Sequence, residues 1–167
     1  MQIPRRKSEE LRQRDEGPIY LTEQGIKRLK GELEHLKRVL PERIQETART
    51  AAFGDRSDNA EYKAAKSLLR GTHYRILTVE EQLKRAVVIK RGGTASGLIR
   101  LGSAVVLESN GIRKEYEILG SQETDPGRGR ISHVSPLGAA LMNRKKGDTV
   151  SVTTRSGTRE YRILEIR

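Results

Sequence analysis

The sequence contains no cysteine and no tryptophan, has few aromatic residues, and lacks any long hydrophobic run. Without cysteine, disulfide bonds and thiolate metal sites are excluded. The six aromatic residues are scattered, which argues against a surface that stacks nucleic-acid bases. No apolar stretch approaches the ~18 residues of a membrane span, and the basic start of the chain lacks the apolar segment of a secretory signal. We therefore expect a cytoplasmic protein that makes no membrane contact.

Several catalytic motifs are also missing. The three histidines, His35, His73 and His133, are far apart in the sequence and form no HExxH pattern, so structural roles are favoured over metal binding. The chain has neither the GxxxxGK(S/T) loop of nucleotide hydrolases nor the GxSxG turn of serine hydrolases. A nucleotide hydrolase or a serine hydrolase therefore has no support.

Charge is the dominant feature of what the chain does contain. Of its 167 residues, 33% are charged and only 34% are hydrophobic, so a large globular core is not expected. A long pair of helices with a narrow apolar seam would explain this balance, because most of its surface faces water. The formal net charge of +11 indicates an anionic partner, most often nucleic acid or a nucleoprotein machine.

Two heptad-patterned segments predict an antiparallel helical hairpin within residues 19–91. Thr22 is a suitable N-cap for the first helix, and Pro41 is expected to kink it or force a local adjustment. The second helix is expected from about Asn59 to Ile89. The first seam comprises Ile26, Leu29, Leu33, Leu36, Leu40 and Ile44. The second seam comprises Tyr62, Ala65, Leu69 or Leu68, Ile76, Val79, Leu83 and Ala86.

The position numbers of facing seam residues add to a constant value, as antiparallel pairing requires. Leu36 with Ile76, Leu33 with Val79, and Ile44 with Leu68 all give 112. The hairpin is therefore centred on position 56, inside an acidic turn that we call the tip segment, residues 54–61. The first arm is expected to reach roughly 45–50 Å. Residues 1–18 show no periodicity, and we expect a flexible extension.

The hydrophobic period changes to two after residue 97, which predicts a small β-rich domain over 98–167 behind a glycine-rich linker at 92–97. Asn110-Gly111 and Ser156-Gly157 are hairpin turn signals. Ser135 and Pro136 are expected as N-cap and first residue of a short helix from Leu137 to Asn143. The fold class is therefore α+β.

Charge placement singles out the tip segment and the helix that follows it. The tip segment is acidic, whereas residues 62–91 are strongly basic. Lys63, Lys66 and Arg70 recur at helical spacing, and with Arg49 they form what we call the basic patch. Two interpretations of the basic patch are equally favoured by the charge. It is either a helix face exposed to solvent or a surface that binds a phosphate backbone.

Two acids in the tip segment, Asp55 and Asp58, are three residues apart. In a helical turn their carboxylates would lie close enough to share one hard cation such as Mg²⁺. The spacing by itself favours a simpler explanation, in which Asp58 and Glu61 form a capping box and Asp55 closes an Asx-turn.

The tip and its frame resemble the bacterial Gre transcript cleavage factors, GreA and GreB, over about residues 19–167. The most specific match is GDRSDNAEY at 54–62. Its residues and the basic residues around it look more like GreB than GreA. Further matches are Leu21-Thr22, Gly25, Leu29, Glu32 and Leu33, then Ile118-Leu119-Gly120 and Ile131-Ser132. The last are Ser135-Pro136-Leu137-Gly138-Ala139-Ala140-Leu141 and Lys146-Gly147-Asp148.

The resemblance implies a factor that is not itself an enzyme but activates RNA cleavage by bacterial RNA polymerase. The hairpin would enter the secondary channel, where Asp55 and Asp58 would help hold a Mg²⁺ ion shared with the polymerase, and no cofactor would be bound stably by the factor alone. Arg56, Ser57, Asn59, Glu61 and Tyr62 would shape the tip. The basic patch (Lys63, Lys66, Arg70 and Arg49) would face the nascent RNA 3′ end. An FKBP-like C-terminal domain would dock on the channel rim through Ser135 and Pro136, with the factor acting as a monomer.

Two departures from the family pattern leave other functions open. Position 58 is Asp where the family usually has Glu, and Val134 stands where it usually has Asn or Asp. The first change favours a non-cleaving regulator of the secondary channel as the alternative. The charge alone is also compatible with a coiled-coil protein that binds free RNA or DNA directly.

Overall fold

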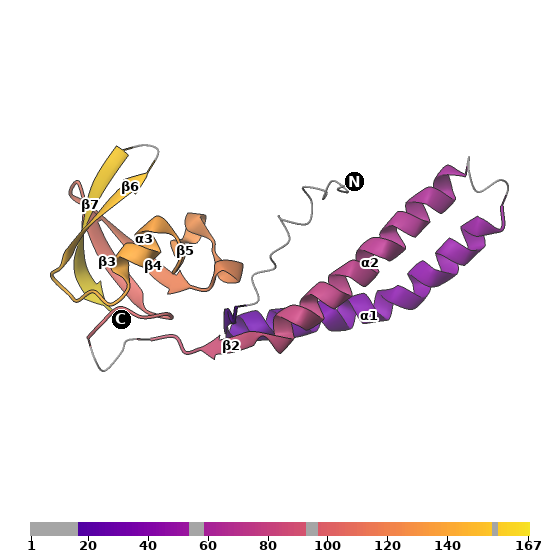
Figure 1. Ribbon diagram of the computed structural model, residues 1–167, viewed down its shortest axis with the longest axis horizontal. Coiled ribbons are helices and arrows are strands. Elements are labelled where there is room, and N and C mark those ends of the chain that lie inside the picture. Colours follow the sequence, from indigo (N-terminus) through magenta and orange to yellow (C-terminus); the bar gives the residue numbers. More distant parts are fainter. Residues whose placement is uncertain (1–16, 54–58, 93–96, 155–156) are drawn as a thin grey trace, which may run out of the picture.

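The computed structural model describes residues 17–53, 59–92, 97–154 and 157–167. Most of the extension predicted at 1–18 and of the linker predicted at 92–97 lies outside these residues. In the described part, a long helical hairpin projects from a short two-stranded sheet, and a β-rich domain packs beside the base of the hairpin (Figure 1). No helix among the described residues is long and apolar enough to cross a membrane.

The hairpin consists of α1 (Glu23–Ala51) and α2 (Ala60–Lys84), which run side by side in opposite directions (Figure 1). Thr22 caps α1 as predicted, since its hydroxyl accepts a hydrogen bond of 3.0 Å from the Gly25 amide. The 29 residues of α1 give a rod of about 44 Å at 1.5 Å per residue. Pro41 lies inside α1, which continues through it as one helix.

The seam of the hairpin differs from the prediction beyond Pro41. Ile44 and Leu68, which were predicted to face each other, are 48% and 53% exposed. The more buried positions on α1 are Arg43, Thr47 and Thr50, and Leu69 rather than Leu68 is half-buried on α2. The seam steps alternate between three and four residues, and the next step of three from Leu40 leads to Arg43. The prediction that placed Ile44 in the seam because it is apolar was therefore wrong.

The predicted register still holds in the outer half, because the position numbers of Thr50 and Tyr62, and of Thr47 and Ala65, also add to 112. The outer seam is therefore polar on α1, whereas on α2 it is formed by Tyr62, Ala65 and Leu69. The inner half carries the apolar cluster of Leu21, Leu29 and Val79. This distribution leaves most of the hydrophobic stabilisation at the base of the hairpin.

The second helix ends earlier than predicted, at Lys84 instead of Ile89. Residues 86–89 form β2 (Ala86–Ile89), which pairs in parallel with β1 (Ile19–Thr22), so that Ile19 lies opposite Ala86. Three consecutive β-branched residues, Val87, Val88 and Ile89, favour this extended conformation over helix. The two strands close the base of the hairpin.

The C-terminal domain is a five-stranded sheet in the order β5-β4-β3-β7-β6. Its strands are β3 (Ala104–Ser109), β4 (Ile112–Leu119), β5 (Arg130–Ser132), β6 (Thr149–Thr154) and β7 (Gly157–Ile166). Its core is buried beneath α3 (Pro136–Leu141), and the buried core residues are Ile99, Val105, Leu107, Ile118, Leu141, Val150 and Ile163.

The turn predictions in this domain are met in part. Asn110 and Gly111 both have positive φ angles, 53° and 75°, as a two-residue hairpin turn requires. In the second hairpin Gly157 already pairs with Thr154 as the first residue of β7. The predicted turn residue Ser156 lies outside the described residues.

The short helix α3 begins as predicted and ends two residues early. Ser135 is its N-cap and Pro136 its first residue. Met142 has an extended ψ of 134° and Asn143 a positive φ of 63°, so neither continues the helix.

The two halves of the molecule meet through η2 (Ser121–Glu123), which follows β4 and touches β1. The Glu123 carboxylate accepts hydrogen bonds from the amide of Thr22 at 2.5 Å and from its hydroxyl at 2.6 Å. Tyr20 packs edge-on against His133 at 5.5 Å, and Arg91 pairs with Glu117 at 2.7 Å. After η2, the chain forms η3 (Pro126–Arg128), which leads into β5. The joint is therefore polar and specific.

Candidate functional site

The far end of the hairpin is closed by Asn59, at the end that lies farthest from the C-terminal domain (Figure 1). The Asn59 side-chain oxygen accepts a hydrogen bond of 2.9 Å from the Tyr62 amide and so caps α2. Its side-chain nitrogen donates to the carbonyl oxygens of Thr50 at 2.8 Å and Phe53 at 2.6 Å. One amide side chain therefore ties the last turn of α1 to the first turn of α2.

Thr50 supports this contact from α1. It is only 1% exposed, and its hydroxyl donates to the carbonyl oxygens of Glu46 at 2.9 Å and Thr47 at 3.2 Å. The sequence prediction missed Thr50, although steps of seven residues lead from Leu36 through Arg43 to Thr50 and so mark it as a seam position.

The acids singled out from the sequence, Asp55 and Asp58, lie outside the described residues, as do Arg56 and Ser57. One part of the simpler explanation for Asp58 is nevertheless wrong. The capping residue of α2 is Asn59, not Asp58, so the capping box predicted from Asp58 and Glu61 does not begin this helix. Among the described residues, no group of three or more potential ligands is placed to hold a metal ion.

The first turn of α2 carries Glu61 and Tyr62. Glu61 is exposed, and an acid in the first turn of a helix is favourably placed beside the helix N-terminus. The Lys66 ammonium lies 5.5 Å from the centre of the Tyr62 ring, a cation–π contact that holds this lysine near the tip.

The basic patch is brought together in part. Lys63, Lys66 and Arg70 are exposed on one face of α2 and make no ion pair with a described residue. Arg49 is different, because it forms a bidentate ion pair with Glu46 at 2.7 and 2.9 Å. This pairing raises the pKa of Arg49 and lowers the pKa of the Glu46 carboxyl. The free positive charge of the patch is therefore concentrated on α2.

The two arms are also joined by charged side chains farther from the tip. Glu32 on α1 accepts two hydrogen bonds from Arg75 on α2, at 2.5 and 2.9 Å, and the pKa of Glu32 is lowered as a result. Lys37 and Glu80 form a second bridge at 2.7 Å. These exposed pairs lie in the inner half of the hairpin and add modestly to the pairing of the two arms.

The proposed docking residues Ser135 and Pro136 lie in a well-ordered turn at the start of α3. The Ser135 hydroxyl accepts from the Gly138 amide at 3.1 Å and donates to the Ser132 carbonyl at 2.6 Å. Pro136 is exposed, and the neighbouring Val134 is 67% exposed. The turn thus presents a small apolar surface on a hydrogen-bonded base.

Comparison with known proteins assigns both halves of the chain. A family model described as "Transcription elongation factor, N-terminal" matches residues 19–88, and one described as "Transcription elongation factor, GreA/GreB, C-term" matches residues 94–167. These matches define the class, a transcription elongation factor built from a helical hairpin and a β-rich domain. The chain belongs to the GreA/GreB family.

Curated relatives agree with this assignment. The chain is 42% identical to transcription elongation factor GreA of Thermoanaerobacter pseudethanolicus, over 90% of this chain and 98% of that protein. It is 40% identical to GreA of Caldanaerobacter subterraneus subsp. tengcongensis over the same shares. These relatives carry the name GreA, so the expected closeness to GreB is not supported.

Solved structures of the family are also similar to this chain. GreA factor homolog 1 (Gfh1) of Thermus thermophilus is 32% identical, with a TM-score of 0.41 over 90% of this chain and 99% of that one. A GreA/GreB elongation factor from Nitrosomonas europaea is 19% identical, with a TM-score of 0.39 over 89% of this chain and 98% of that one.

Proposed function

We propose that this protein acts on bacterial RNA polymerase by inserting its hairpin into the secondary channel and stimulating cleavage of backtracked RNA by the polymerase itself. The observation that carries the proposal is the Asn59 clamp. It joins α1 to α2 at the end of an arm about 44 Å long, on either side of the segment that contains Asp55 and Asp58. Acids carried at the end of such an arm can act inside a partner while the rest of the protein stays outside.

In this proposal the acids complete a site that belongs to the polymerase. Asp55 and Asp58 supply carboxylate oxygens, which are the ligands that Mg²⁺ prefers. A Mg²⁺ ion shared with the polymerase would make a bound water more acidic. The protein would bind no cofactor stably on its own and would catalyse nothing alone.

The remaining residues of the candidate site would position the RNA and the factor. Lys63, Lys66 and Arg70 present positive charge behind the tip and form no ion pair with a described residue, and this charge suits the phosphate backbone of the RNA 3′ end. Ser135 and Pro136 would dock on the rim of the channel, with the exposed Val134 beside them.

The test uses stalled, backtracked polymerase that carries end-labelled RNA. Wild-type protein is expected to release short 3′ fragments, and Asp55→Asn is expected to slow their release on the order of 10²-fold because the metal and water lose a ligand. Glu42→Gln replaces an exposed acid in the middle of α1 and serves as the matched control, with cleavage unchanged.

The same assay distinguishes the non-cleaving alternative. If wild-type protein inhibits nucleotide addition and releases no fragment, while Asp58→Glu restores release, the protein is a secondary-channel regulator. If neither protein produces fragments or inhibition, the polymerase proposal is wrong.

A further inference from the structure

The core-facing side of the C-terminal sheet is not fully covered. On each of β4 and β7, alternate residues form a stripe along the core-facing side. The two stripes begin in the buried core, at Ile118 and Ile163. The same stripes then reach the half-buried Tyr116 and Tyr161, and end at the exposed Lys114 and Arg159. The two strands flank β3 and carry the same pattern, basic-Glu-Tyr-x-Ile, at 114–118 and 159–163.

The length of α3 explains why this end of the sheet stays open. Its six residues span about 9 Å, whereas the eight residues of β4 span about 27 Å. The helix packs on β6 and β5 and covers the core residues, but not the outer part of β4 and β7.

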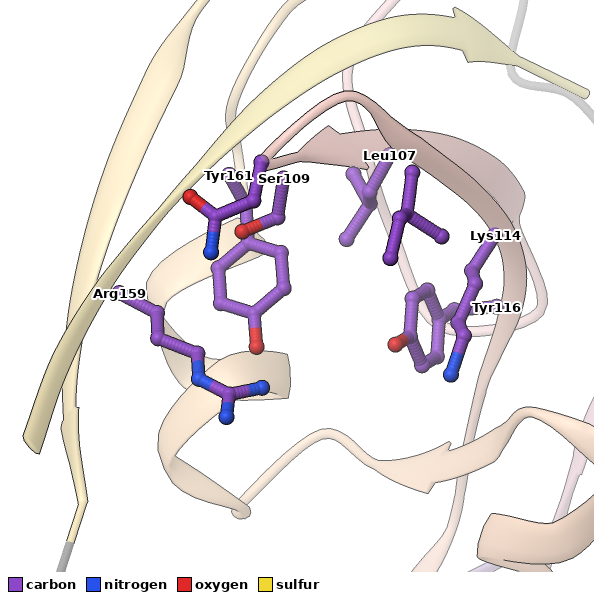
Figure 2. Close-up of a pocket in the computed structure, with 8 residues that line it drawn as sticks. Leu107, Ser109, Lys114, Tyr116, Arg159 and Tyr161 are labelled. Atoms are coloured by element: carbon purple, nitrogen blue, oxygen red, sulfur yellow. The ribbon is translucent and has the colours of Figure 1, made fainter. Parts of the chain in front are cut away.

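A cavity of about 110 Å³ remains over the uncovered part. Leu107, which is 1% exposed, contributes to its lining. In Figure 2, Tyr161 and Arg159 line one side of the cavity, Tyr116 and Lys114 line the opposite side, and both phenol groups extend into the space between them. Ser109, Asn110 and Ile112 complete the lining.

The polar groups around this cavity have no partner in the described part of the chain. The side chains of Lys114, Arg159, Tyr116, Tyr161 and Ser109 make no hydrogen bond or ion pair with any described residue. Burial, with a contribution from Tyr161 and against an opposing one from Arg159, raises the pKa of the Tyr116 phenol. The lining holds two cations and no acid, so it complements an anion.

The size of the cavity limits what it can hold. It is well below the ~300 Å³ at which small-molecule sites begin. A nucleotide would therefore leave most of its surface outside the cavity. A bare phosphate has no apolar part to place against Leu107, whereas an acidic side chain carries methylene groups that would lie there.

We propose that this cavity is a docking site for one glutamate side chain from an acidic segment of a partner protein. Lys114 and Arg159 bind the carboxylate, the hydroxyls of Tyr116 and Tyr161 donate to it, and the methylene groups rest on Leu107. The site is separate from the tip and from Ser135 and Pro136, and it does not depend on any role in RNA cleavage.

The experiment titrates the full-length, ¹⁵N-labelled protein with the capped peptide Ala-Glu-Ala, followed by NMR. We expect saturable shifts at the amides of Lys114, Tyr116, Arg159 and Tyr161, with a Kd of about 1 mM or weaker, as suits a single side chain. The matched peptide Ala-Gln-Ala has the same shape without the charge and is expected to produce no such shifts.

Variants identify the residues responsible. Lys114→Gln combined with Arg159→Gln is expected to weaken binding at least tenfold. Both side chains are exposed, so the fold should persist, which the remaining resonances will verify. Arg162→Gln is the control, because Arg162 lies on β7 but alternates onto the opposite face.

Three results would each overturn the proposal. The first is equal binding of the glutamine peptide, and the second is unchanged binding by the double variant. The third is a stronger response to inorganic phosphate or to a ribodinucleotide than to the glutamate peptide, which would make this a phosphate site.

Discussion

At the scale of single residues, Asn59 has the largest structural consequence for the candidate site. Its side chain satisfies an amide at the start of α2 and two carbonyls at the end of α1. These backbone groups belong to helix ends, which lack partners within their own helices. A residue with both a donor and an acceptor on one short side chain is needed here, and asparagine provides both.

Substitution separates the two roles of Asn59. Asn59→Ser keeps a hydroxyl that can cap α2 but loses the two donated bonds, so we expect a loss of about 1–2 kcal/mol in the free energy of unfolding. Asn59→Ala also loses the cap, and we expect a loss of about 2–3 kcal/mol. Urea unfolding followed by helical circular dichroism measures both.

Gln45→Ala is the control for these variants, since it removes an exposed amide from α1 and should change stability by less than about 0.5 kcal/mol. Equal stability of the serine and alanine variants would show that the cap contributes nothing, and a serine variant as stable as the wild-type protein would show the same for the bridge to α1.

At the scale of elements, the hairpin has an apolar base and a polar outer half. Ile76 is 8% exposed, whereas Ile44 is 48% exposed although the sequence placed it in the same seam. The heptad spacing determines which positions of α1 face α2, whether or not they are apolar. In the outer half these positions are Arg43, Thr47 and Thr50. In the described part of the outer half, Asn59 supplies the hydrogen bonds that join the two arms.

The two isoleucines provide a direct comparison. Ile76→Ala leaves a cavity in the seam and should cost about 2–4 kcal/mol. Ile44→Ala removes a side chain that already faces water for about half its surface, and should cost less than about 1 kcal/mol. Thermal or urea unfolding of the two variants provides the measurement, and similar losses would restore Ile44 to the seam.

Much of this element could be predicted from the sequence, because antiparallel register depends only on where the heptad positions fall. The pairing of Leu33 with Val79 followed from residue numbers alone. The end of α2 could not be predicted in this way. Ala86 fits a helical seam equally well, and only β1, more than 60 positions away, offers residues 86–89 a strand partner.

At the scale of the whole molecule, the two halves are held in one arrangement by the contact of Glu123 with Thr22. Glu123 belongs to the C-terminal domain, yet its carboxylate binds the amide and hydroxyl of the residue that caps α1. A negative charge at this helix end is also favoured by the helix dipole. Gly25 permits the approach, since a Cβ there would collide with the Glu123 carboxylate.

Gly25→Ala and Glu123→Ala should therefore remove the same contact. We expect Glu123→Ala to reduce the free energy of unfolding by about 1.5–3 kcal/mol, as for hydrogen bonds to a charged group. Gly25→Ala should cost about 1 kcal/mol less, because alanine favours the helix more than glycine does. The double variant should lose little more than either single variant, and hydrogen exchange at the Thr22 amide should accelerate in all three.

Gly31→Ala is the matched control on α1. Its Cβ would meet nothing within 4 Å, so helix propensity should make it neutral or stabilising by up to about 1 kcal/mol. Additive losses from Gly25→Ala and Glu123→Ala would mean that the two residues act independently, contrary to the proposed joint.

The sequence by itself determined the α+β class, the hairpin register, the Asn110-Gly111 turn and the start of α3, because each depends on residues close in the chain or on a repeating period. The tertiary structure alone decided that Glu123 meets Thr22, that residues 86–89 pair with β1, and that a short α3 leaves Tyr116 and Tyr161 beside an open cavity. These features depend on the lengths and meeting points of elements far apart in the chain, which local propensity does not encode.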